Sequence, residues 1–126
     1  GPENAEGVVA WLDGPPLENL PGGPAFKAAY DAAGFKEPPE AYGPFAYVAA
    51  QIIITAIEEV GPDRAKVAEK INVTDLTDTI IGPVKFNEFG QNEIPLASAY
   101  VAQDGVWVYW PNSEYASGVR KMPGAE

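Results

Sequence analysis

Two short stretches of the chain alternate hydrophobic and polar positions with the period of an α-helix, and both have clear ends. One helix is predicted over residues 24–33, because Pro24 suits the first helical position and Gly34 can adopt the left-handed conformation that closes a helix. Another is predicted directly after Asp63, whose side chain can cap a helix N-terminus. Its apolar residues form a narrow stripe, which indicates a surface helix: Val67, Ala68 and Ile71.

A longer helix is predicted over residues 44–60, and its pattern is different. Apolar residues occupy nearly its whole circumference, and the acidic Glu58 and Glu59 come only at its end, before Gly61. A helix that is hydrophobic all round is normally covered on most sides. We therefore expect this helix to be packed against more than one neighbouring layer.

The segments before and after these helices have the patterns of strands and connectors. Residues 6–13 form a short, nearly continuous apolar run, which is typical of a strand buried on both faces of a parallel sheet. Residues 14–23 contain three prolines and three glycines and are predicted to be a connector. A short strand followed by a polar turn is expected over 82–90. The tail from Asn112 has no period, so we expect it to wander over the surface.

The strongest local signal is a β-hairpin over residues 97–111. Asp104 and Gly105 separate two alternating runs, and this dipeptide favours a two-residue hairpin turn. A two-residue loop fixes the register of the hairpin. The predicted cross-strand pairs are Val101 with Val108, Tyr100 with Tyr109, and Ala102 with Trp107.

Composition and charge then exclude several classes of function. The chain has 126 residues, enough for one domain or part of one, and its net charge is −10, which disfavours nucleic acid and anionic membranes as partners. It contains no His and no Cys, so triads that need either residue are impossible and thiolate or imidazole metal ligands are absent. The acidic pairs Glu58–Glu59 and Asp75/Asp78 are predicted to be solvated charges, the second in a polar loop. We expect no catalytic residue, no metal and no cofactor.

The loop that leads into the long helix contains the remaining candidate chemistry. Tyr42, Phe45 and Tyr47 gather where backbone N–H groups of a helix N-terminus are available to an anion or a carboxylate. These aromatic residues either belong to the core or line a cleft, and the pattern alone leaves both open. The order strand, three helices, strand, hairpin makes a poor closed domain. It indicates the end of a larger α/β protein.

Taken in order, several segments resemble the C-terminal portion of the branched-chain amino-acid-type solute-binding proteins of ABC transporters. They are "EGVVAWL", "PAFKAAYDAAGFKEPPEAYGPFAYVAAQIIITAIEEVG", "AKVAEKI", "DTIIGPVKFNEFGQNE" and "YVAQDGVWVYWP". The resemblance implies an α/β fold that is the C-terminal part of a two-lobe, type I periplasmic binding protein, with three-layer αβα lobes, and incomplete as a stand-alone unit. It covers nearly the whole chain but only about the last third of such a protein.

The same resemblance implies an arrangement of the chain and a site. Residues 1–20 would be a strand of the second lobe with a hinge crossover, residues 21–90 the closing helices and a strand of the first lobe, and residues 91–126 the return crossover, a hairpin of the second lobe and the tail. Tyr42 falls where the family places an aromatic residue on the ligand, with Gly43 and Phe45 as neighbours.

The function that the resemblance implies is binding without catalysis. An extracytoplasmic or periplasmic component of an ABC importer would hold an amino acid or a small carboxylate between two hinged lobes and deliver it to a membrane permease. The rest of the same protein, or a second copy of the chain, would complete the fold. The alternative is a ligand-sensing domain of a receptor, or a non-transport interaction domain, on the same architecture.

Overall fold

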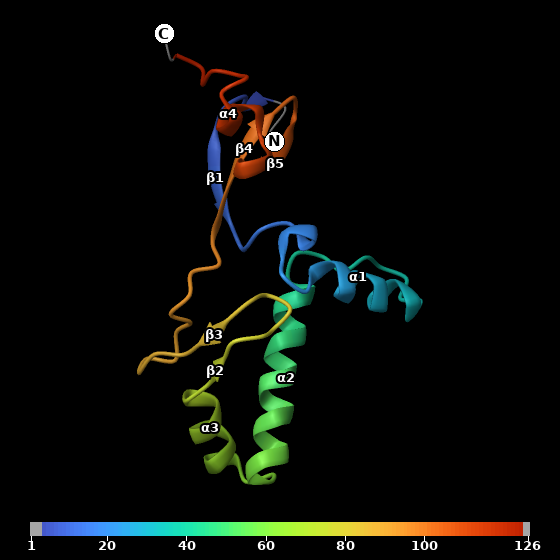
Figure 1. Cartoon of the computed structure of the whole chain (residues 1–126), viewed down its shortest axis with the longest axis vertical. Helices are drawn as coiled ribbons and strands as arrows, with labels where there is room; N and C mark the ends of the chain where they lie inside the picture. The colour runs from blue at the N-terminus through green and yellow to red at the C-terminus, as the bar shows by residue number, and fades with distance from the viewer. Residues whose placement is uncertain (1–3, 125–126) are drawn as a thin grey trace. The chain divides into compact units, whose positions relative to one another are not determined.

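The computed structural model describes residues 4–124 of the chain (Figure 1). These residues divide into two compact units, which are described separately. Unit 1 comprises the segment up to Pro16 and the segment from Leu96 onward. Unit 2 comprises residues 17–95. The chain therefore passes between the units twice, after Pro16 and after Pro95.

Unit 1 is built on a three-stranded antiparallel sheet in the order β1-β4-β5. Its strands are β1 (Val9–Leu12), β4 (Ser98–Gln103) and β5 (Val106–Tyr109). The hairpin of β4 and β5 has the predicted register, in which Tyr100 pairs with Tyr109, Val101 with Val108 and Ala102 with Trp107. Asp104 and Gly105 both have positive φ, 52° and 82°, as this tight turn requires.

The prediction for β1 is wrong in its pairing and its burial. β1 pairs antiparallel with β4, where Val9 is opposite Val101, and it lies at the edge of the sheet. Its side chains are not covered on both faces within the described residues, since Trp11 is 72% exposed and Leu12 is also exposed. A continuous apolar run predicts burial on both faces of a strand, but the described residues do not provide a covering layer for each face.

The prediction of a wandering tail is also wrong. After a 3₁₀ turn at Trp110–Asn112, a short helix α4 (Glu114–Ser117) forms, and Gly118 closes it with a φ of 77°. Ser113 caps α4 by accepting a hydrogen bond from the Ala116 N–H at 3.1 Å. Tyr115 is buried. The tail is therefore a fixed part of unit 1 as far as the residues around Arg120.

Unit 2 contains the three predicted helices with bounds close to those expected. They are α1 (Gly23–Ala32), α2 (Gly43–Val60) and α3 (Arg64–Asn72). Gly34 and Gly61 have φ values of 71° and 78°, and Asp63 caps α3 by accepting hydrogen bonds from two backbone N–H groups at 3.0 and 3.1 Å. A 3₁₀ turn at Leu17–Asn19 precedes α1. These predictions succeeded because each cap acts within a few residues.

The strands of unit 2 are shorter than the sequence suggested. A two-stranded antiparallel ribbon joins β2 (Asp75–Leu76) to β3 (Val84–Lys85), and Asn92 continues it by a bridge to Phe86. Asp75 therefore lies in a strand, contrary to the predicted loop. The polar turn after β3 is present, because Asn87 accepts hydrogen bonds from the backbone N–H groups of Phe89 and Gln91.

The long helix α2 buries one face only, so the prediction that it is packed on most sides is wrong for the described residues. Its buried positions recur every four residues: Pro44, Val48, Ile52 and Ala56. Ile53, Ile54 and Ile57 on its other faces are exposed. Among the described helices, α2 alone has the length and mean hydropathy, 1.2, of a possible membrane span, a criterion that core helices of soluble proteins also meet.

Candidate functional site

The predicted site residues lie at the N-terminus of α2, where the chain turns sharply into the helix. Tyr42 precedes the helix with φ and ψ of −83° and −13°, Gly43 begins it, and Pro44 occupies its first turn. The Gly43 N–H donates to the Glu40 carbonyl at 2.9 Å, and the Ala46 N–H donates to the Tyr42 carbonyl at the same distance. Pro44 is buried, which anchors the turn to unit 2.

The three predicted site residues differ in their burial. Tyr42 is 65% exposed, whereas Phe45 and Gly43 are half-buried. A Cβ atom built on Gly43 would lie 3.4 Å from the Pro39 side chain, an ordinary contact distance, so space alone does not demand glycine there. The structure therefore presents one large aromatic ring outward, beside a helix N-terminus whose first turn contains no acidic residue.

A hollow of about 500 Å³ opens between α1 and α2, and none of the three predicted residues lines it. Its lining is almost wholly apolar: Ala25, Phe26, Ala29, Tyr30, Phe35, Tyr47 and Ile80. The ring centroids of Phe26 and Tyr47 are 5.5 Å apart in an edge-to-face arrangement, and those of Tyr30 and Phe35 are 4.7 Å apart. This surface can hold an aliphatic or aromatic group.

Part of the signal for this hollow is present in the sequence. Phe26, Ala29 and Tyr30 share one face of the predicted first helix, and Tyr47 belongs to the aromatic start of the second. What the pattern does not reveal is that Phe35 and Ile80 join them, since one follows the helix and the other comes from the loop before β3. Of the aromatic residues around Tyr42, Tyr47 is thus the one that lines this hollow.

A smaller hollow of about 220 Å³ shares Tyr47 and Ile80 with the first and is more polar. Gln51 and Asp78 also line it, and the Gln51 side-chain amide donates to the Tyr47 hydroxyl at 3.3 Å. The backbone N–H of Gly22 donates to the Ile80 carbonyl at 3.0 Å, which fixes this side of α1 to the loop. Polar and apolar groups therefore lie side by side on this face of unit 2.

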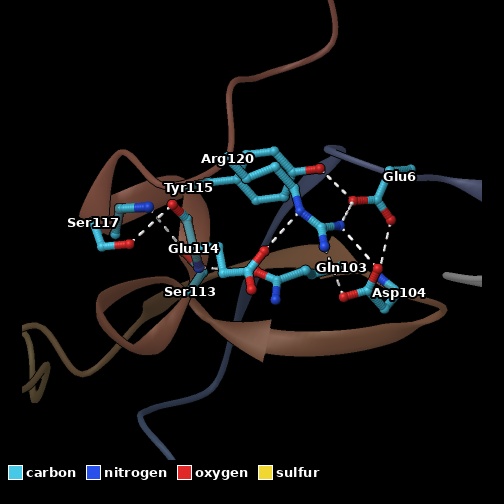
Figure 2. Close-up of polar contacts among 9 residues, drawn as sticks. Glu6, Gln103, Asp104, Ser113, Glu114, Tyr115, Ser117 and Arg120 are labelled. Atoms are coloured by element: carbon cyan, nitrogen blue, oxygen red, sulfur yellow. Dashed lines mark hydrogen bonds and ion pairs between the residues drawn. The ribbon is translucent and has the colours of Figure 1, made fainter.

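The densest group of charges lies in unit 1 and surrounds Arg120 (Figure 2). The guanidinium group makes a bidentate pair with Asp104, both contacts at 2.9 Å, and contacts Glu6 at 2.6 Å and Glu114 at 2.9 Å. Tyr115 donates its hydroxyl to the Glu6 carboxylate. Each carboxylate is thus engaged by a cation on the same unit, an arrangement that holds structure together.

Hydrogen bonds and nearby charges shift pKa values within this cluster. The hydroxyl of Tyr115 and the guanidinium of Arg120 lower the pKa of Glu6 below its ordinary value, and the same Glu6 carboxylate raises the pKa of Tyr115. Hydrogen bonds to Asp104 and Glu6 raise the pKa of Arg120 further. These shifts keep Glu6 ionised, Tyr115 protonated and Arg120 charged, as their contacts require. Sequence analysis missed the group because Glu6 lies 114 residues from Arg120 and the other members follow no periodic pattern.

Comparison with known proteins identifies the family to which this chain belongs. A family model described as periplasmic binding protein matches residues 1–105. The chain belongs to the periplasmic binding protein family. No curated protein matches the sequence significantly.

Solved structures show the fold of this periplasmic binding protein chain. A leucine-binding protein from Thermotoga maritima MSB8 matches 85% of the chain with a TM-score of 0.66 and 24% identity. A solute-binding protein of an ABC transporter from R. palustris, solved in complex with benzoate, matches 83% of the chain with a TM-score of 0.62 and 18% identity. The chain spans only 31% and 29% of the length of these two structures.

The predicted fold class is therefore confirmed, since the chain has the α/β fold of part of a type I periplasmic binding protein. The resemblance to solute-binding proteins of the branched-chain amino acid type is confirmed as well. The ligand-binding roles of Tyr42, Gly43 and Phe45 stay predictions.

Proposed function

We propose that this chain is the C-terminal portion of the solute-binding component of an ABC importer, which works outside the cytoplasm and binds a small ligand between two hinged lobes. Membership of the periplasmic binding protein family carries this proposal. In this proposal the protein binds its ligand without catalysing a reaction, and it has no catalytic residue and no cofactor of its own. The absence of His and Cys from the sequence is consistent with recognition by shape and hydrogen bonds.

The two units supply the parts that such a mechanism needs. Unit 2, residues 17–95, would belong to the first lobe, and unit 1 would belong to the second lobe. The two crossovers, after Pro16 and after Pro95, would be hinge passages. Closing two lobes around a ligand requires large backbone rotations at only a few such positions. The division into two compact units supports this assignment.

The ligand that we propose is an amino acid or a small carboxylate. The proteins named above as leucine-binding and as bound to benzoate make this class the natural one to test. In this chain, Tyr42 offers an exposed aromatic ring next to the N-terminus of α2. The positive end of the helix dipole favours a carboxylate at such a position. Gly43 and Phe45 would shape the backbone and the wall beside it.

The chain would act together with other polypeptide. Exposed apolar side chains on α2 and β1, among them Ile54 and Trp11, call for covering layers that the described residues do not contain. We propose that the rest of the same protein, or a second copy of the chain, provides them. The complete two-lobe protein would then deliver its ligand to a permease in the membrane.

Calorimetry on the complete two-lobe protein tests the proposed site. With branched-chain amino acids and benzoate as probes, we expect Tyr42→Ala to weaken binding by roughly 1–3 kcal/mol, about five- to 150-fold in Kd. The melting temperature without ligand should change little, because most of the Tyr42 side chain is exposed. Phe89→Ala is the matched control, since Phe89 is an exposed aromatic residue on the same unit.

Two results would overturn parts of this proposal. If Tyr42→Ala lowers the melting temperature and leaves affinity unchanged, Tyr42 belongs to the packing of the protein. If the complete protein binds none of these probes, the proposed ligand class is wrong. The 126-residue chain alone should bind them weakly, because a site with one wall loses most of the burial on which affinity rests.

A further inference from the structure

One long-range hydrogen bond fastens the first crossover to unit 1. Tyr100, in β4, donates its hydroxyl to the backbone carbonyl of Gly14 at 3.0 Å. Gly14 is buried, its φ is 83°, and its N–H donates to the Leu12 carbonyl at 3.0 Å. Both backbone polar groups of Gly14 are therefore bonded within unit 1. At this φ, any residue other than glycine would be strained.

This bond holds the chain beyond the end of the sheet. The last pair of β1 and β4 joins Leu12 to Ser98, so both crossovers leave the sheet at the same pair of residues (Figure 1). On the first crossover, the bond from Tyr100 holds Gly14, which lies two residues beyond the last sheet pair at Leu12. Unit 2 begins its own hydrogen bonding at Leu17, whose carbonyl accepts from the Leu20 N–H. Only Pro15 and Pro16 lie between the two attachments.

These two prolines form a short, stiff connection. Their rings fix φ near −65°, and neither has an N–H to donate. The second crossover is held differently, since Ser98 donates its hydroxyl to the Leu96 carbonyl, two residues away, at a long 3.4 Å. The ring of Tyr109 packs against that of Tyr100 with centroids 5.5 Å apart, which orients the Tyr100 hydroxyl. The first crossover is thus fastened by a packed side chain, and the second by a local contact.

We propose that Tyr100 is a positioning residue that fixes the pivot of the first crossover. By holding the Gly14 carbonyl, it confines bending to the ψ rotations of Pro15 and Pro16, whose φ angles are fixed, and keeps Asp13 and Gly14 moving with unit 1. This inference rests on the proposed function, in which two lobes close about hinges. Tyr100 contributes to the range of hinge motion without touching the ligand.

Pulsed spin-label distance measurements on the complete two-lobe protein, without ligand, test this proposal. The chain has no cysteine, so labels can be placed singly at Asn112 in unit 1 and Ala68 in unit 2, both exposed. Labelled chain is diluted into an excess of unlabelled chain, so that distances within one molecule are measured. Tyr100→Phe keeps the ring and removes the donor, whereas Tyr109→Phe, in the other ring of the pair, is the matched control.

We expect Tyr100→Phe to broaden the distribution of distances and Tyr109→Phe to leave it as in the parent chain. Amide exchange at Gly14 should accelerate roughly two- to tenfold in Tyr100→Phe, as expected for one lost hydrogen bond. Exchange in β4 and β5 should be unchanged. Amide exchange in β4 and β5 reports whether the sheet stays intact, so a second label pair within unit 1 is not needed as a control.

Three outcomes would overturn the proposal. One is a distribution in Tyr100→Phe that matches the parent. Another is equal broadening in both variants, which would assign the effect to aromatic packing. The third is faster exchange throughout the sheet, which would make Tyr100 a residue of sheet stability alone. The measurement needs no ligand, so failure of the proposed function would appear separately, as absence of binding in calorimetry.

Discussion

At the scale of single residues, the cluster around Arg120 links several acidic side chains of unit 1 through a single cation. One guanidinium group serves three carboxylates that come from opposite ends of the chain: Glu6, Asp104 and Glu114. The side chain of Arg120 is 30% exposed and also lies over the ring of Tyr115, 5.6 Å from its centroid. Several charge-assisted bonds to one fixed group contribute more than isolated surface pairs do.

Replacing Arg120 by Ala should destabilise unit 1, because it leaves three carboxylates close together without their shared cation. We expect a lower melting temperature for Arg120→Ala and faster amide exchange in α4 and β1. Lys121→Ala removes a neighbouring, exposed positive charge and should have little effect. Circular dichroism melts of the two variants measure the difference. Equal melting temperatures in both would mean that the cluster adds nothing to stability.

The stability of unit 1 should also depend on acid pH through Glu6. Its pKa is lowered in the folded chain, chiefly by the hydrogen bond from Tyr115 and the contact with Arg120, so folding favours the ionised form. That contribution is complete above the range in which a free glutamate titrates, at a pH of about 4 to 5, and is lost as the pH falls through the lower folded pKa. Urea unfolding at stepped pH should show this loss, and Glu6→Gln should show less of it.

The residue scale also explains what could be predicted from the sequence. The cap that Asp63 forms on α3 was predictable, because its partners lie two and three residues away. The contact of Arg120 with Glu6 was not, because 114 residues separate them and neither stands in a periodic pattern. The sequence pattern also does not show whether Tyr42 faces a cleft, because aromatic residues occur both in protein cores and at exposed positions.

At the scale of elements, local rules predicted the helices and the hairpin, and tertiary context decided the rest. The Asp104–Gly105 turn fixes the register of β4 and β5, and Gly61 ends α2, as expected from φ values that favour glycine. β2 was missed because it is two residues long and exists only through its pairing with β3. The apolar circumference of α2 predicted more covering layers than the described residues provide.

Substitutions at two isoleucines of α2 can measure how much covering the helix lacks. Ile52 is 8% exposed and Ile54 is 55% exposed, so truncating each to Ala removes the same atoms from two environments. In the 126-residue chain, at concentrations too low for association, Ile52→Ala should cost about 2–5 kcal/mol in free energy of unfolding and Ile54→Ala less than about 0.5 kcal/mol. In the complete two-lobe protein, Ile54→Ala should become costly as well. Denaturant unfolding of both variants, alone and in the complete protein, makes the test.

At the scale of the whole molecule, the chain corresponds to 31% of the length of the leucine-binding protein structure that it matches. The order of its motifs predicted that relationship, because a Pro- and Gly-rich connector, a long apolar helix and a final hairpin are distinctive when they occur as a set. The layers that would cover Trp11 on β1 and Ile54 on α2 were not predictable from these residues. Apolar surface of this extent, with β1 at the edge of its sheet, favours association with further polypeptide.

We therefore predict that the 126-residue chain does not persist as a lone, well-folded monomer. At micromolar concentration it should either pair with a second copy, by exchange of strands or helices, or fold fully only when the rest of the two-lobe protein is added. Light scattering gives the mass, and amide exchange at Ile54 and Trp11 reports whether their elements become covered on association. A monomer that melts cooperatively, with both elements already protected, would contradict the prediction. In that case the exposed face of α2 would be a stable surface, and the chain would be a domain in its own right.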